Sequence, residues 1–247
     1  MKLTILGSGT AAPVLDRNCA GYLLEIDNKK LLFDSGAGTI RRLLELKIDL
    51  FKIEHIFYTH LHNDHINDLG AVIWSNNYGG IRKKPLNLYG PKGFREYCDI
   101  LIKKLLKAPK FNFKISVKEL KNSTIKIKNL TIKTYPTKHS STTKSIAYRV
   151  EQKNNSLIYA GDTDYCNEII EASRNADALL IECSLPKKAE GHLTPLLAGK
   201  IVAKANVKTL ILTHFYPEVL KTNIKKECKK EFNGKVILAK DKMTIEI

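Results

Sequence analysis

The sequence has few of the features that would place it in a membrane or a disulfide framework. Its 247 residues include five scattered cysteines, none of them in a CxxC pair, which argues against a disulfide framework and a zinc ribbon and predicts reduced, mostly buried thiols. No segment has the roughly eighteen apolar residues that a bilayer span needs. The first residues, MKLTILGSG, are typical of a strand and a turn and lack the features of a signal peptide. We therefore expect a cytoplasmic protein without a membrane partner.

Arginine is also scarce, although the chain is strongly basic. The formal net charge is +16, but only seven of the 41 basic residues are Arg, and the lysines are spread along the whole chain. Such a charge attracts polyanions and steers anionic substrates, yet lysine-rich surfaces also arise from composition or growth at high temperature. The charge alone leaves open whether the protein binds nucleic acid.

The chain shows no repeat, low-complexity linker or composition break, so we expect one domain over residues 1–247. Apolar runs typical of strands, such as LTILG, AGYLLEI and KLLFDS, alternate with helical patterns, the first of them over residues 39–47. Strands and helices continue to alternate to the end of the chain. This order predicts an α/β fold with layered sheets and helices outside them.

One motif is misleading. Gly7, Gly9 and Ala12 match the G-x-G-x-x-A dinucleotide fingerprint, with Asp27 or Asp34 at the distance of a ribose contact. A dinucleotide site needs a crossover helix after this turn, but only residues 13–19 precede the next strand. The spacing therefore argues against a dinucleotide cofactor.

The stretch YTHLHNDHIND holds three of the seven histidines within six residues, directly after the predicted strand over residues 53–59. We expect Asp64 to be the N-cap of the helix that follows. Further ligand-type residues also follow strands, so all should converge on one rim of the sheets and could hold a metal; together they are His60, His62, Asp64, His65, His139, Asp162 and His214. The alternative is a surface cluster of imidazoles, and His55, inside a strand, is interpreted as structural.

These motifs resemble the metallo-β-lactamase fold superfamily, in which HxHxDH is followed by a single His, a single Asp and a late His. The segments LGSGTAAP, LFDSGAG, LNLYGPKG and AGDT, and the pair IECS with GHLTP, are most similar to the ribonuclease Z and small phosphodiesterase branch. The resemblance covers essentially the whole chain. It implies a four-layer αββα sandwich and a metal-dependent hydrolase.

The resemblance also implies a distribution of ligands over two divalent ions, with Zn²⁺ as the first choice and Mn²⁺ or Fe²⁺ as alternatives. One ion would take His60, His62 and His139, the other would take Asp64, His65 and His214, and Asp162 would bridge them. A hydroxide held by the two ions would be the nucleophile. Relatives that reduce oxygen carry Glu in place of His62, so the pattern favours hydrolysis.

His192 in EGHLTP is not needed as a ligand in this arrangement. In the resembling branch, a His at the matching position protonates the departing oxygen and is held by an acid that corresponds to Glu182 in IECS. We therefore count Asp64, His192 and Glu182 as catalytic residues. The alternative is a loop histidine that caps the helix beginning at Thr194–Pro195.

The substrate is the least defined part of the prediction. Enzymes that process tRNA usually carry a long arm between the third metal motif and the bridging Asp, but here only 22 residues separate His139 from Asp162. The basic segment 81–114 could be another RNA platform, or a solvated helix whose Leu101, Leu105 and Leu106 face the core. We expect a phosphodiesterase for small or single-stranded substrates, such as RNA or cyclic nucleotides, with tRNA 3′-end cleavage as the runner-up.

The sequence leaves three further points open. A lactone or thioester hydrolase of the same fold would keep the ligands without needing His192 and Glu182. A non-catalytic nucleic-acid binder would depend on its lysines and lose affinity with salt. A homodimer is also compatible with the sequence.

Overall fold

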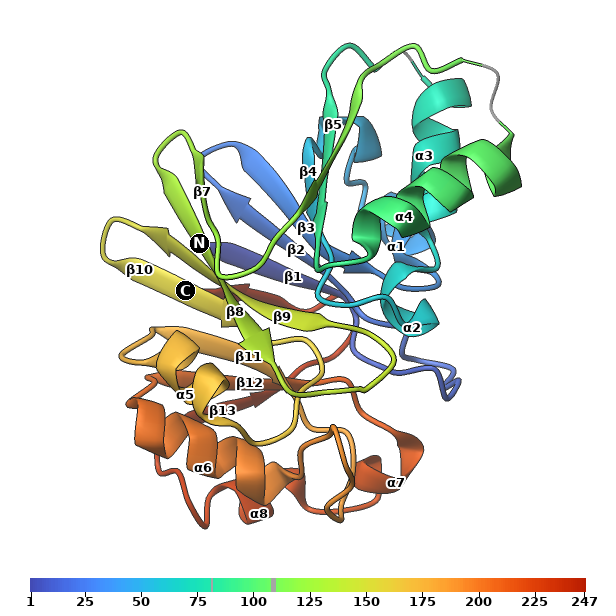
Figure 1. The fold of residues 1–247 in the computed structure, drawn as a ribbon. Coiled ribbons are helices and arrows are strands. Elements are labelled where there is room, and N and C mark those ends of the chain that lie inside the picture. Colours follow the sequence, from blue (N-terminus) through green and yellow to red (C-terminus); the bar gives the residue numbers. More distant parts are fainter. Residues whose placement is uncertain (81, 108–109) are drawn as a thin grey trace.

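The computed structural model describes residues 1–80, 82–107 and 110–247, and its strands form two seven-stranded sheets (Figure 1). The first sheet has the order β14 (Thr244–Glu246), β1 (Lys2–Gly7), β2 (Gly21–Ile26), β3 (Lys29–Ser35), β4 (His55–Phe57), β5 (Leu86–Gly90) and β6 (Ile115–Glu119). The second has the order β13 (Lys235–Leu238), β12 (Thr209–Thr213), β11 (Ala178–Glu182), β10 (Asn155–Tyr159), β9 (Ser145–Gln152), β8 (Leu130–Thr137) and β7 (Thr124–Ile127).

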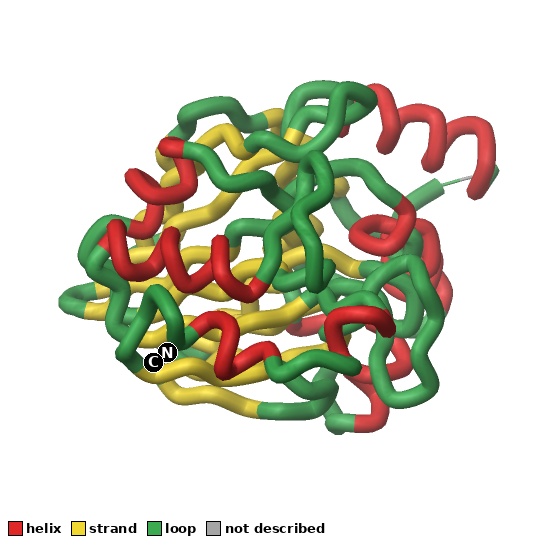
Figure 2. The backbone as a smooth tube through the Cα atoms, turned by 90° about the horizontal axis from the view of Figure 1, so that it is seen from below, coloured by secondary structure: helices red, strands yellow, loops and turns green. Residues whose placement is uncertain are grey.

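Helices cover the outer face of each sheet, and the two chain ends lie side by side (Figure 2). The first sheet carries α1 (Thr39–Glu45), the 3-10 helix η1 (Leu50–Lys52), α2 (Asn63–Ile66), α3 (Leu69–Tyr78), α4 (Phe94–Ile100) and the π-helical turn η2 (Leu101–Leu106). The second carries α5 (Asn167–Ser173), α6 (Pro195–Ala205), α7 (Pro217–Leu220) and α8 (Ile224–Cys228). The predicted αββα sandwich is confirmed.

The alternation of side-chain direction along each strand explains how the layers of the fold are packed. In β3, Leu31 and Phe33 belong to the core between the sheets, whereas Leu32 belongs to the core beneath the helices. Successive side chains point to opposite faces of a strand, so a strand covered on both faces reads as a continuous apolar run. This is why central strands such as β3 and β11 contain continuous apolar runs, whereas β7 and β8 alternate apolar and polar residues.

Strand direction determines where the polar residues gather. Strands β3 to β6 are parallel in the first sheet, as are β10 to β13 in the second. Parallel strands place their carboxyl ends, and the loops that follow them, at one edge of a sheet. Residues that follow β4, β10 and β12 therefore reach the same rim of the molecule.

Two local predictions are wrong. Asp64 is not an N-cap, because the helix divides into α2 and α3, with His62 and Asp68 at their N-cap positions. Asp64 lies in the first turn of α2, where its carboxylate faces other polar groups. Leu105 does not face the core and is 69% exposed, because it lies in η2 at the outer end of the helical pair. Residues 81, 108 and 109 of the basic segment lie outside the described residues.

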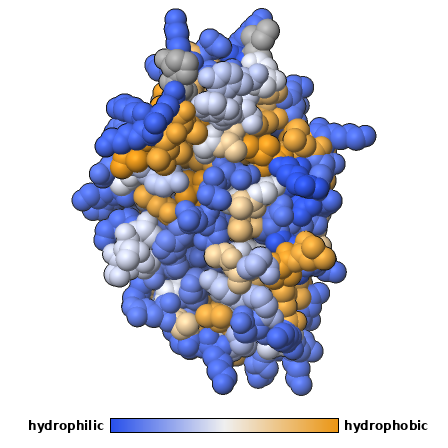
Figure 3. All heavy atoms as spheres, turned by 90° about the vertical axis from the view of Figure 1, so that its right-hand side faces the viewer, coloured by the Kyte–Doolittle hydropathy of each residue, from blue (hydrophilic) through white to orange (hydrophobic). Residues whose placement is uncertain are grey.

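The remaining observations concern the surface, the cysteines and the connection after His139. The face in Figure 3 is largely hydrophilic, with separate hydrophobic patches. No helix among the described residues has the length and apolar character to cross a membrane. All five cysteines are free thiols, three of them buried, as predicted. Residues 140–161 form β9, β10 and their connections, so they contain no additional arm.

Candidate metal centre

The seven residues that the sequence pointed to meet at the rim shared by the two sheets. His60 and His62 follow β4, and Asp64 and His65 lie in α2. The second sheet contributes its residues from the ends of β8, β10 and β12, namely His139, Asp162 and His214. The ligand atoms fall into overlapping groups, each within 4.8 Å. His55 instead stacks on Tyr89, with Nδ1 3.2 Å from the tyrosine hydroxyl, as its structural interpretation predicts.

The first group consists of three imidazoles. His62 Nδ1 lies 3.1 Å from His60 Nε2 and 3.1 Å from His139 Nε2. Nitrogens about 2.0–2.1 Å from a tetrahedral Zn²⁺ are separated by about 3.3 Å, close to this spacing. Burial and the neighbouring His65 hold the pKa of His60 well below its usual value, so its ring is neutral and has a lone pair. The group can therefore hold a cation.

The second group combines two imidazoles and a carboxylate. His214 Nε2 lies 3.1 Å from His65 Nε2 and 3.2 Å from Asp64 Oδ2. Burial raises the pKa of Asp64, but the hydrogen bond and charge of the two histidines outweigh burial and lower the pKa to about 2. Asp64 is therefore ionised at neutral pH, as a metal-binding carboxylate must be.

Asp162 lies between the groups. Its Oδ1 is 3.3 Å from His65 Nε2 and 3.5 Å from His214 Nδ1, whereas its Oδ2 is 4.0 Å from His60 Nε2 and 3.9 Å from His139 Nε2. Burial opposes ionisation, but the charges of His214 and His65 hold the pKa of Asp162 well below its usual value. Its buried Oδ1 has no hydrogen-bond partner among the described residues. Such an atom is costly unless a cation satisfies it, so the donor set fits a divalent metal.

Asp34 holds His65 directly and His60 through Thr59, and sequence reasoning missed this role. Its carboxylate accepts hydrogen bonds from the backbone N and Oγ1 of Thr59, at 2.8 Å each, from His65 Nδ1 at 2.7 Å and from the Tyr159 hydroxyl. Thr59 Oγ1 in turn lies 3.0 Å from His60 Nδ1. Because the Nδ1 atoms are engaged, the Nε2 atoms face the cluster. The only signal in the sequence was an acidic residue within the apolar run LFDSG, which the structure buries completely.

The second-sheet histidines are held by neighbouring loops. His139 Nδ1 lies 2.9 Å from the Gly191 carbonyl, and His214 Nδ1 lies 3.0 Å from Ser184 Oγ. Gly191 has φ +77°, and an added Cβ would lie 2.2 Å from the His139 carbonyl, so only glycine allows this approach. His214 itself has φ 56°, a left-handed conformation that costs energy in a non-glycine residue and is common at functional sites.

His192 and Glu182 form the predicted pair beside the cluster. His192 Nδ1 lies 3.1 Å from both carboxylate oxygens of Glu182, which also accepts from the backbone N of Thr163 and Leu193. Burial lowers the pKa of His192, but the hydrogen bond and charge of Glu182 outweigh burial and raise it to about 9. The capping alternative is wrong, because Thr194 is the N-cap of α6. Within the described residues, the ring of His192 forms hydrogen bonds only through Nδ1, and its Nε2 has no partner.

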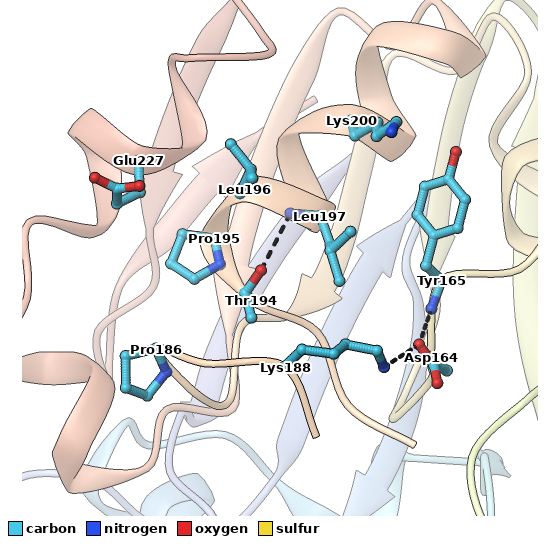
Figure 4. A pocket seen from close by; sticks show the side chains of 10 residues that line it. All are labelled: Asp164, Tyr165, Pro186, Lys188, Thr194, Pro195, Leu196, Leu197, Lys200 and Glu227. Atoms are coloured by element: carbon cyan, nitrogen blue, oxygen red, sulfur yellow. Dashed lines mark hydrogen bonds and ion pairs between the residues drawn. The ribbon is translucent and has the colours of Figure 1, made fainter. Parts of the chain in front are cut away.

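Lys188, in the loop that carries His192, forms an ion pair with Asp164 (Figure 4). Lys188 Nζ donates hydrogen bonds to Asp164 Oδ1 and to the Ala189 carbonyl, next to a cavity of about 680 Å³. Thr194 Oγ1 accepts from the backbone N of Leu197 and begins α6. The contact between Lys188 and Asp164 connects the loop after β11 to the loop after β10, which carries Asp162.

Comparison with known proteins assigns the chain to a family. The model of the family described as anti-Pycsar protein Apyc1 matches residues 1–236. The chain belongs to this family.

This member of the Apyc1 family is also similar to named hydrolases. Ribonuclease Z of Methanothermobacter thermautotrophicus is 27% identical over 302 residues, which cover 100% of this chain and 97% of the relative. The crystal structure of the metallo-β-lactamase fold protein YhfI from Bacillus subtilis superposes with a TM-score of 0.86 at 26% identity, covering 100% and 99% of the two chains. The short form of human tRNase Z gives 0.84 at 25% identity, with the same coverage.

These similarities confirm the resemblance to the metallo-β-lactamase superfamily and its ribonuclease Z branch. The protein is a metal-dependent hydrolase, and its similarities are to nucleases and phosphodiesterases. The His and Asp clusters at the rim are suited to divalent cations.

Proposed function

We propose that residues 1–247 form one hydrolase domain that cleaves small or single-stranded phosphodiesters with two divalent ions. The observation that carries this proposal is the His192–Glu182 pair, with Nδ1 3.1 Å from both carboxylate oxygens, next to the cluster. A phosphodiester with an alkoxide leaving group needs a proton donor at the departing oxygen. The pair provides this donor where the substrate would meet the cluster.

In this proposal the ions are held by the two groups already described. His60, His62 and His139 take one ion, Asp64, His65 and His214 take the other, and Asp162 contacts both. The spacing of the imidazole nitrogens and the unsatisfied Oδ1 of Asp162 support this assignment. Zn²⁺ suits the donor set best, with Mn²⁺ or Fe²⁺ as alternatives. Divalent ions supply charge neutralisation of the phosphoryl oxygens and lower the pKa of water.

The protein's own catalytic groups are Asp64, His192 and Glu182. His192 donates the proton on Nε2 to the departing oxygen, while Glu182 stays ionised and holds the ring by Nδ1. Asp64 accepts a hydrogen bond from the backbone N of Ala11 at 3.0 Å, which fixes its carboxylate. Ionised at neutral pH, it is an acceptor for a proton of the attacking water.

The size of the substrate follows from the connection between His139 and Asp162. It contains β9, β10 and short connections, so no arm extends from this place to grip a folded RNA. Small diesters, cyclic nucleotides among them, and single strands therefore rank first. The similarity to ribonuclease Z over the whole chain favours tRNA 3′-end cleavage as the second candidate. A lactone hydrolase ranks below both, because it has no need of the His192–Glu182 pair.

A substrate screen tests the proposal. Protein loaded with Zn²⁺ or Mn²⁺ is assayed with bis-p-nitrophenyl phosphate, 2′,3′-cyclic nucleotides, a pre-tRNA and a lactone, and His60→Ala is the control for contaminating activity. We expect hydrolysis of the diesters that is lost in the control. Hydrolysis of the lactone with no turnover of any phosphodiester would overturn the proposal.

A further inference from the structure

Residues 8–11, which we call the Ser8 segment, belong to the glycine motif that matches a dinucleotide fingerprint. A Cβ on Gly7, just before the segment, would lie 1.8 Å from the carbonyl oxygen of Cys19, so glycine lets these two parts of the chain approach closely. Across the same contact, the backbone N of Gly9 donates to the carbonyl of Asn18 at 2.8 Å. The glycines therefore serve a close packing of backbone on backbone.

The Ser8 segment contacts the second metal group at two places. The backbone N of Ala11 donates to Asp64 Oδ2 at 3.0 Å, and this oxygen also lies 3.2 Å from His214 Nε2. The carbonyl of Ser8 accepts from the backbone N of Phe215 at 3.0 Å, directly after His214. The left-handed conformation of His214 persists only where neighbouring contacts hold the backbone. One segment therefore fixes both the carboxylate of Asp64 and the backbone of His214.

Asp241 holds the Ser8 segment from the other end of the chain. It lies in the connection between β13 and β14, and 5% of its side chain is exposed. Its Oδ1 accepts from the backbone N and the Oγ of Ser8, at 2.9 and 2.7 Å. Its Oδ2 accepts from the backbone N of Asn18 and from Arg42 Nη2, at 2.8 Å each. Hydrogen bonds to a carboxylate are short and strong, so these four fix the start of the segment.

Arg17 completes the attachment. Its Nη1 donates to Ser8 Oγ at 2.6 Å and to the carbonyl of Ala239 at 2.9 Å, and its guanidinium lies 5.0 Å from the centre of the Phe215 ring. Ser8 Oγ thus accepts from Arg17 while it donates to Asp241. The connection that carries Asp241 runs from the second sheet to the first, so the Ser8 segment is attached where the two sheets meet.

We propose that Asp241 is a positioning residue of the metal centre. Through Ser8 it fixes the segment that orients the carboxylate of Asp64 and the backbone after His214, and so it sets the affinity of the second group for its ion. The inference rests on the two-ion assignment of the proposed function and adds a residue that acts through the backbone of others. Groups that orient metal ligands typically change metal affinity by about 10–100-fold.

The first test measures the metal affinity of Asp241→Asn. The carboxamide keeps the shape of the side chain but replaces one acceptor oxygen with a donor, so two of the four donors lose their acceptor. Zn²⁺ is titrated into metal-free protein in competition with a chromophoric chelator, which gives the affinities of the two ions separately. We expect one affinity to fall at least about tenfold and the other to stay unchanged.

Asp177→Asn is the matched control. Asp177 Oδ2 accepts from the backbone N and the Oγ of Ser156, at 2.7 and 3.0 Å, and its Oδ1 accepts from Lys208 Nζ at 2.7 Å. This repeats the arrangement around Asp241, but directly before β11, at the opposite edge of the second sheet from the metal centre. The control should therefore bind both ions as wild type does.

A comparison in two ligand variants identifies the affected ion. In His62→Ala the first group is incomplete, and Asp241→Asn should still weaken binding at the second group at least about tenfold. In His214→Ala the second group is itself incomplete, so Asp241→Asn should not change the affinity of the first group. Such a dependence on the background measures coupling between residues. Equal losses in both backgrounds would indicate general destabilisation and overturn the inference.

Amide exchange on metal-free protein tests the attachment itself. Asp241→Asn should speed exchange at Ala11 and Phe215, because a released segment opens more often, and Asp177→Asn should not. If Asp241→Asn does not fold, Ser8→Ala replaces it in all three measurements, since it removes the Oγ hydrogen bonds and keeps the backbone of the segment. Ser156→Ala is then the matched control.

The outcomes separate this inference from the proposed function. If wild type binds two ions and cleaves diesters, but Asp241→Asn binds both ions with unchanged affinity, the inference is wrong and the proposed function stands. Equal weakening of both ions, or the same loss in Asp177→Asn, would also refute it. If no diester is cleaved, the proposed function is wrong, and the Zn²⁺ competition still decides the role of Asp241.

Discussion

His192→Ala should remove the proton donor and leave the metal groups intact. His192 Nδ1 contacts Glu182, and its ring centroid lies 5.0 Å from that of His139 and 6.3 Å from that of His214. The ring is thus next to both groups, but in our proposal it is a ligand of neither. We therefore expect the variant to retain its metal content, measured by elemental analysis after gel filtration.

The expected loss depends on the leaving group. A lost general acid slows a reaction by roughly 10²–10⁴-fold, which corresponds to about 3–5 kcal/mol in the activation free energy. Diesters with alkoxide leaving groups, such as a 2′,3′-cyclic nucleotide, should show this full loss. Cleavage of p-nitrophenol diesters should slow much less, because p-nitrophenolate departs without a proton. The ratio of the two losses is therefore the quantity to measure.

The same pair predicts a pH dependence. Glu182 raises the pKa of His192 to about 9 against the effect of burial, so the ring is protonated and able to donate below that pH. Activity on poor leaving groups should fall as the pH rises through this pKa. Bound cations lower the pKa, and Glu182→Gln should lower it further and shift the alkaline limb of the profile to lower pH. Activity on p-nitrophenyl esters should not show this shift.

One result would refute the reasoning. If His192→Ala cleaves good and poor leaving groups with equal losses, His192 is not the proton donor, and the main reason for preferring phosphodiesters over lactones disappears. His60→Ala and His214→Ala serve as controls, since both should lose metal and slow every substrate alike.

Four further predictions concern the ligands, the substrate and the supporting contacts. Elemental analysis should find close to two divalent ions per chain, and fewer in Asp162→Ala; none after reconstitution would contradict the metal centre. Small diesters should be cleaved at least as fast as pre-tRNA in matched assays, and efficient trailer removal without diester cleavage would reverse that ranking. Asp34→Ala should reduce metal affinity about 10–100-fold in chelator competition, because His65 loses its partner; unchanged affinity would leave Asp34 a purely structural role. Lys188→Ala should change the unfolding free energy by less than about 1 kcal/mol, since the Lys188 side chain is half exposed, yet it should slow the cleavage of substrates with poor leaving groups. Unchanged kinetics would show that the ion pair with Asp164 does not position His192.

Sequence reasoning found the residues of the rim because their signal is local and chemical. A histidine or acid directly after an apolar strand is easy to recognise, and the parallel strands then bring such positions together. The layers were predicted from the alternation of apolar strand runs with helical patterns, which indicates sheets covered by helices. For these features, the pattern along the chain contains most of the information.

The sequence missed features that depend on contacts between distant segments. Asp34 accepts hydrogen bonds from Thr59, His65 and Tyr159, and no spacing rule connects these four positions. The break between α2 and α3 was missed because the residues favour one continuous helix, whereas the structure turns Asp64 towards His214. The helical period of the sequence places Leu105 on the core-facing side, but the tertiary packing leaves it exposed. Each error therefore comes from three-dimensional context.

The cluster takes its residues from both sheets, so bound ions affect how firmly the two sheets are held together. Four of its residues belong to the first sheet and its helix α2, and three follow strands of the second sheet. In our assignment each ion takes ligands from both halves, so it acts as a crosslink across the open rim of the sandwich. An ion present at a hundred times its dissociation constant would stabilise the folded chain by about 2.7 kcal/mol. Chelation should therefore loosen the contact between the two sheets at this rim before it unfolds either one, and amide exchange in α2 and in the loop over residues 137–145 should rise together.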